Sequence, residues 1–144
     1  MTLETIAFGW WNLLGILLGG LAYFFLGAAW YTKLFGKRWV AATGRTTDEF
    51  KDESPGLGML LTFGGSFVTT AVLALVYGWA GGNTVLDGLA IGAILGAGVA
   101  AMEGMKAAVY NFDERARPWA LYAVNASYTV CGITLAGAVY ALVV

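Results

Sequence analysis

The side chains that could carry chemistry within this chain are few, and they lie in its third and fourth apolar stretches. Lys106 follows Glu103 by three positions, so the two can form an ion pair on one helix face. An ionisable residue inside a membrane span is a functional candidate, because burying its charge costs about 2.5–3.5 kcal/mol at mid-bilayer. Counting equally backward and forward from the loop between the two stretches places Glu103 opposite Asn125, with Tyr128 three residues further on. Two interpretations stay open for this candidate polar site: a structural contact between helices, and a proton or solute site.

Other catalytic chemistry has little to build on. The chain has no histidine and a single cysteine, Cys131, which excludes His-based acid–base catalysis, bis-His haem ligation and internal disulfides. A run of carboxylates in the first half of the chain is typical of a solvated helix face rather than a cation site. We therefore expect no enzyme activity, no cofactor and no metal site. The carboxylates of that run are Asp48, Glu49, Asp52 and Glu53.

Composition indicates the class of protein that holds these residues. Of 144 residues, 59% are hydrophobic and 12% are charged, whereas soluble domains have about 45–50% apolar and about 25% charged residues. A helix needs about 20 mainly apolar residues to cross the hydrocarbon layer. We predict an all-α integral membrane protein, one domain folded as a four-transmembrane-helix bundle, with spans at residues 6–31, 57–80, 86–109 and 119–142. Glu4 stands where a signal peptide would be basic, so we expect the first span to be retained.

The basic residues indicate an orientation. All eight lie in or beside two connecting segments, 32–56 and 110–118. Lys and Arg concentrate in loops that stay in the cytoplasm, so both segments are predicted to be cytoplasmic and both termini to lie on the opposite side. Basic residues beside acyl chains favour contacts with anionic headgroups, so we expect contact with the bilayer, including bound lipid, and no nucleic-acid surface. The eight are Lys33, Lys37, Arg38, Arg45, Lys51, Lys106, Arg115 and Arg117.

The first connecting segment leaves the membrane gradually. Residues 30–43 suit a short interfacial helix with aromatic anchors. Gly44 breaks this pattern, and Thr46 with Glu49 has the spacing of a capping box that starts a further helical turn. The bundle should therefore carry a short interfacial or cytoplasmic helical segment between spans 1 and 2. The predicted membrane-interface rim consists of Trp30, Tyr31, Lys33, Lys37, Arg38 and Trp39.

Every predicted span carries small or polar residues at helical spacing. Small residues allow close approach of helix backbones, which is the main attraction between helices in lipid. We expect these faces to pack the bundle, and those of the first and third spans to pack a second copy of the protein too. The helix-packing residues are Gly15, Gly19, Gly88, Gly92, Gly96 and Gly104. The second span has a comparable stripe of Gly58, Thr62, Gly65 and Thr69.

Residues 24–50 (FFLGAAWYTKLFGKRWVAATGRTTDEF) resemble the signature of a bacterial membrane family catalogued as domain of unknown function 1761. That signature has Gly-x-x-Trp-Tyr at the end of the first span, then Leu-Phe-Gly-Lys-x-Trp, then a Thr-led acidic helix. The matching residues here are Gly27, Trp30, Tyr31, Leu34 to Lys37, Trp39 and Thr46 to Glu49, and later Phe112, residues 124–128 (VNASY) and Gly137. Thr32 replaces the usual Pro, so we expect the turn there to be more helical.

The resemblance implies four spans and bacterial origin, and it brings no established activity, cofactor or catalytic residue. We accordingly expect a multi-pass protein of the bacterial inner membrane that acts by packing, either as a self-associating protein or as an accessory subunit of a membrane complex. The alternative is a small oligomeric channel or exporter with a polar path at Glu103, Asn125 and Tyr128.

Overall fold

The computed structural model describes residues 9–51, 53–54 and 56–144, and within these residues the chain is helical and has no strand. Four of its helical stretches are long and apolar enough to cross a membrane: Trp10–Leu34, Gly56–Trp79, Val85–Val109 and Pro118–Val143. The expected all-α, four-span fold is therefore confirmed, and the chain is a multi-pass membrane protein. Part of the predicted first span, residues 6–8, lies outside the described residues, as do positions 52 and 55 of the first connecting segment.

The first and third spans each include a π-helical stretch. The first span is α1 (Trp10–Ala29) continued by η2 (Trp30–Leu34), and the third is α5 (Val85–Ile94), η3 (Leu95–Ala101) and α6 (Met102–Val109). The second and fourth spans are the single helices α4 (Gly56–Trp79) and α7 (Pro118–Val143). Two short helices, α2 (Gly36–Thr43) and α3 (Thr47–Lys51), lie between the first and second spans. This is the short helical segment that the sequence predicts there.

The helix does continue past Trp30, as the absence of proline at position 32 led us to expect. The Thr32 hydroxyl donates a hydrogen bond of 2.6 Å to the carbonyl of Ala28, so the side chain satisfies a backbone acceptor near the helix end. The backbone leaves helical geometry at Phe35 (φ −125°), where the chain turns into α2.

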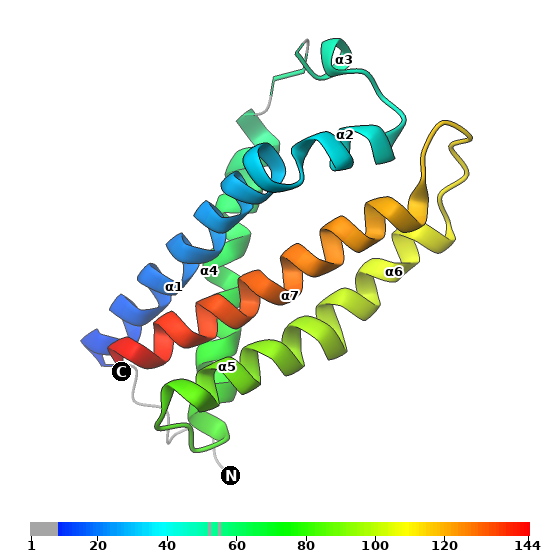
Figure 1. Cartoon of the computed structure of the whole chain (residues 1–144). Coiled ribbons are helices and arrows are strands. Elements are labelled where there is room, and N and C mark those ends of the chain that lie inside the picture. Colours follow the sequence, from blue (N-terminus) through cyan, green and yellow to red (C-terminus); the bar gives the residue numbers. More distant parts are fainter. Residues whose placement is uncertain (1–8, 52, 55) are drawn as a thin grey trace.

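α7 lies at the centre of the bundle. It packs against α1, α4 and each part of the third span, and also against α2. In Figure 1 it runs between α1 and the α5–α6 span, and α4 crosses behind. A helix with neighbours on several sides must bury residues around much of its circumference. Its buried residues are Tyr128, Gly132, Ile133, Ala136, Gly137 and Tyr140.

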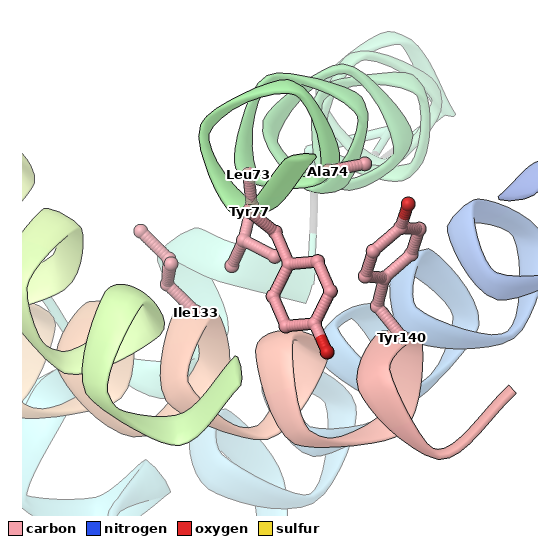
Figure 2. Close-up of a cluster of buried hydrophobic side chains, with 5 residues drawn as sticks. All are labelled: Leu73, Ala74, Tyr77, Ile133 and Tyr140. Carbon is pink, nitrogen blue, oxygen red and sulfur yellow. The ribbon is translucent and has the colours of Figure 1, made fainter. Parts of the chain in front are cut away.

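The apolar core joins α4 to α7. Figure 2 shows Leu73, Ala74 and Tyr77 of α4 facing Ile133 and Tyr140 of α7. The two tyrosine rings meet edge to face, with centroids 5.4 Å apart, a geometry that aromatic quadrupoles favour.

All of the basic residues belong to one end of the bundle, which we call the basic end. It holds α2, α3, the end of α6 and the loop before α7, while the turn between α4 and α5 and the C-terminus lie at the other end (Figure 1). Gly81, in the left-handed region with φ +71°, reverses the chain between α4 and α5, and a capping box of Thr84 and Asp87 starts α5. Both features are local, so the antiparallel path of these two spans is fixed within a few residues.

Candidate functional site

The glycines of the first span pack against α7 and α4. A Cβ added at Gly15 would lie 2.8 Å from the Tyr140 ring, and one added at Gly19 would lie 2.9 Å from the carbonyl oxygen of Ala136. Both distances are too short for a real Cβ contact, so any larger residue would push α1 away from α7.

The glycines of the third span approach α7 more closely still, and their neighbours are backbone atoms. A Cβ at Gly92 would lie 2.6 Å from the Ile133 carbonyl oxygen, one at Gly96 would lie 2.9 Å from the Val130 Cα, and one at Gly88 would overlap the Gly137 carbonyl. Because a backbone cannot move aside as a side chain does, this face needs glycine. Five of the predicted helix-packing glycines are thus occupied within the bundle, namely Gly15, Gly19, Gly88, Gly92 and Gly96.

Gly104 departs from this pattern, although it continues the four-residue spacing. A Cβ at Gly104 would meet nothing within 4 Å. The reason is η3, since a π-helical turn bonds residue i to i+5 and inserts an extra residue into the helix. The buried face accordingly moves from Gly96 to Ala101 and then Ala108, rather than to Ala100 and Gly104.

The same shift turns Glu103 away from the bundle. Its carboxylate accepts a hydrogen bond of 2.6 Å from Lys106, and both side chains are 66% exposed. The ion pair at i, i+3 is present as expected, but the expected position of Glu103 against Asn125 is wrong. Exposed pairs of this kind contribute at most about 1 kcal/mol.

The other two residues of the candidate polar site have separate partners. Asn125 Oδ1 accepts a hydrogen bond of 2.9 Å from the Tyr31 hydroxyl, and the Tyr128 hydroxyl donates one of 3.3 Å to the Tyr23 carbonyl. Glu103, Asn125 and Tyr128 therefore form no hydrogen bonds with one another among the described residues. Asn125 and Tyr128 instead fasten α7 to the first span.

Sequence reasoning missed a connected series of aromatic rings at the basic end. The Tyr128 ring lies 5.3 Å from Tyr23 and 5.2 Å from Tyr31, measured between centroids. Tyr31 in turn lies 5.7 Å from Trp39, and Trp39 lies 5.3 Å from Phe50 of α3. The signal is the density of aromatic residues between positions 23 and 50, of which Trp30, Tyr31 and Trp39 are predicted from sequence only as a membrane-interface rim.

The rim residues divide into two groups. Trp30 is buried, and its indole Nε1 donates a hydrogen bond of 3.1 Å to the Val124 carbonyl, while Tyr31 and Trp39 belong to the aromatic series. Lys33, Lys37 and Arg38 are exposed. The aromatic residues therefore hold α2 and η2 on the bundle, and the cations project outward.

The loop between α2 and α4 is held by charged hydrogen bonds. Arg45 pairs with Glu53, and Glu49 accepts the Thr46 backbone N–H at 2.6 Å in the predicted capping box. The bond from the Thr46 backbone lowers the pKa of Glu49, and the bond from Arg45 lowers the pKa of Glu53. Both carboxylates thus stay ionised at neutral pH and serve as structural acceptors.

Two contacts join the connecting segments to each other. The Arg117 backbone N–H donates a hydrogen bond of 2.8 Å to the Ala42 carbonyl. Gly44 has φ +73°, and a Cβ there would overlap the Arg115 carbonyl. The end of α2 and the start of α7 are therefore held in one rigid arrangement.

The second span differs from the others, because the glycines of its small-residue stripe have no neighbour within the described part of the chain. Every residue from position 56 to 65 is exposed, and a Cβ at Gly58, Gly64 or Gly65 would meet nothing within 4 Å. The described residues thus offer exposed helix faces, buried tyrosines and surface ion pairs.

No curated protein and no solved structure matches the chain. A family model described as protein of unknown function (DUF1761) matches residues 14–141, which includes all of the spans apart from their outermost residues. The chain therefore belongs to the DUF1761 family.

Proposed function

We propose that this protein acts without catalysis, by association of four-span bundles within the membrane, and that the stripe of Gly58, Thr62, Gly65 and Thr69 on α4 is the contact between copies. The observation that carries the proposal is the contrast among glycines. Those of α1 are filled by α7 and α4, and those of the α5–η3 face by α7, whereas those of α4 are open. The same stripe would also allow the bundle to join a larger membrane complex as an accessory subunit.

The direction of the stripe supports the proposal. At about 100° per residue, the stripe lies roughly a quarter turn away from the arc of α4 that packs inside the bundle. That inner arc holds Ser66, Thr70, Leu73, Ala74 and Tyr77. Intramolecular packing therefore does not explain the stripe.

The chemistry of the stripe favours a protein neighbour over lipid. Small residues let another helix backbone approach, and the resulting van der Waals contact is the main source of helix association in a bilayer. The Thr62 hydroxyl already bonds the Gly58 carbonyl at 2.8 Å, so a close neighbour would not leave this hydroxyl without a partner. Large side chains such as Leu57, Leu60 and Val68 cover other arcs of α4, where acyl chains would lie.

The symmetry of the contact follows from the charge pattern. Eight basic residues at one end and none at the other favour one orientation for every copy. Two copies with the same orientation meet about a two-fold axis along the membrane normal, which brings the same stripe from each copy into one contact.

Leucine at position 65 should dissociate the assembly without unfolding the bundle. The added side chain meets open space within one copy, but it would separate two α4 helices in contact. Gly64→Leu is the matched control, because position 64 is equally open and points to a different arc. The mass of the protein–detergent particle should fall for Gly65→Leu alone. Equal masses for both variants and the wild type would refute the proposed contact.

We also propose that the protein lies in the bacterial inner membrane with both termini outside the cytoplasm. In a Cys131→Ser background, a cysteine at Asn83 should react with an impermeant maleimide in intact cells, and a cysteine at Thr47 should react only after permeabilisation. The reason is the retention of basic loops in the cytoplasm. Labelling of position 47 in intact cells would reverse this orientation.

A further inference from the structure

A groove of about 340 Å³ lies between α2 and the first turns of α7, at the basic end. Its charged side chains are Arg38 from α2 and Arg117 from the start of α7. Between them the walls consist of small apolar residues, among them Ala41, Ala120 and Ala123. The groove therefore combines two guanidinium groups with an apolar floor.

Neither arginine has a carboxylate partner within the part of the chain that the structure describes. Arg45, Lys51, Lys106 and Arg115 each form an ion pair there, whereas the guanidinium of Arg38 lies 6.0 Å from the centre of the Phe35 ring. A guanidinium is matched in geometry to phosphate oxygens. The two arginines are thus available for an external anion.

The start of α7 adds a third source of positive potential. This helix has no side-chain N-cap and no acidic residue in its first turn, so the partial positive charge of its free N–H groups is not offset. Arg117 occupies the N-cap position itself. An anion between the two arginines would therefore also meet the positive end of a long helix.

The position of the groove favours a lipid, rather than a free anion, as its ligand. Trp119, one residue past the start of α7, is 58% exposed, and exposed Trp at a span end marks the headgroup region. The arginines lie at the same end of α7, while Ala120 and Ala123 continue along the helix toward the hydrocarbon. We propose that the groove binds one anionic phospholipid, with its phosphate between Arg38 and Arg117 and an acyl chain along the alanines.

The frame of this site is rigid before lipid arrives. The hydrogen bond from the Arg117 N–H to the Ala42 carbonyl fixes α2 against α7, and Gly44 fits against the Arg115 carbonyl. Pre-organisation of this kind lowers the entropic cost of binding. The site is separate from the α4 stripe, so lipid binding and self-association can be tested independently.

Native mass spectrometry of the purified protein, titrated with phosphatidylglycerol or with phosphatidylcholine of the same acyl chains, tests the site. The Arg38→Gln/Arg117→Gln variant should bind phosphatidylglycerol at least about tenfold more weakly, since it removes both guanidinium groups matched to the phosphate, and a hydrogen bond to a charged group contributes about 1.5 kcal/mol or more. The matched control is Lys33→Gln/Lys37→Gln, which removes the same charge from the same end and should leave binding nearly unchanged. Equal losses in the two variants would reduce the site to diffuse electrostatics and overturn the proposal.

Two further measurements test whether the ligand is a lipid or a free phosphate, and whether the apolar floor contributes to binding in addition to the arginines. Inorganic phosphate at the same concentration should not displace phosphatidylglycerol, and displacement would refute the lipid assignment. Ala123→Leu fills the apolar floor at an exposed position and keeps both arginines. It should weaken phosphatidylglycerol binding, while Ala107→Leu, at an exposed alanine of α6, should not. Unchanged binding in Ala123→Leu, or equal affinity of the wild type for phosphatidylcholine, would also contradict the proposal.

Discussion

Leucine at Gly92 is expected to destabilise the bundle by about 3 kcal/mol, the upper end of the usual cost of overpacking. The neighbour that it would meet is the backbone of α7, since a Cβ at this position would already lie 2.6 Å from the Ile133 carbonyl oxygen. To avoid this clash with the Ile133 carbonyl, the whole third span would have to move away from α7. Thermal unfolding in detergent, followed by circular dichroism, measures the loss.

Two leucine variants serve as controls for Gly92→Leu. Ala90 is exposed on another arc of α5, and a Cβ at Gly98 would meet nothing within 4 Å. Both Ala90→Leu and Gly98→Leu should unfold at nearly the wild-type temperature. If all three variants unfolded together, the close approach of α5 to α7 would not support the stability of the bundle.

Alanine at Gly44 is expected to detach the second connecting segment from α2. The residue has φ +73°, a conformation that costs a side-chain-bearing residue about 1–2 kcal/mol. Its Cβ would in addition overlap the Arg115 carbonyl, so the two segments must separate. Limited proteolysis of residues 110–117 should accelerate, and the unfolding temperature should fall.

Gly81→Ala isolates the conformational part of that effect. Gly81 has a similar φ of +71°, but a Cβ there would meet nothing within 4 Å. It should therefore show the conformational cost alone, with no change in proteolysis at the basic end. Equal losses of stability in Gly44→Ala and Gly81→Ala would mean that the contact with Arg115 contributes nothing.

The features that sequence predicted well depend on a few neighbouring residues. The spans follow from uninterrupted apolar length, and the capping box at Thr46 and Glu49 follows from side chains three positions apart. The helical turn at Thr32 follows from the absence of proline. Each of these requires no knowledge of what lies across the bundle.

The features that sequence missed depend on neighbours from other spans. The π-helical stretch Leu95–Ala101 contains no proline, so regular helical spacing predicted that the buried face continues to Gly104, with Glu103 beside it. Which small-residue stripe is filled depends on which span is central, and all of the spans carry such a stripe. The sequence therefore identified the helix faces but not the one that is left open on α4.

Disulfide cross-linking along α4 tests self-association through that open face most directly. In a Cys131→Ser background, single cysteines are placed at Gly58, Leu60, Thr62, Gly64 and Gly65, and membranes are treated with a mild oxidant. A disulfide requires Cα atoms about 4.4–6.8 Å apart, so only residues near a two-fold axis can pair with themselves. We predict covalent dimers from the stripe positions Gly58, Thr62 and Gly65, and none from Leu60 or Gly64. Equal cross-linking at all five positions, or none at the stripe, would contradict self-association through α4.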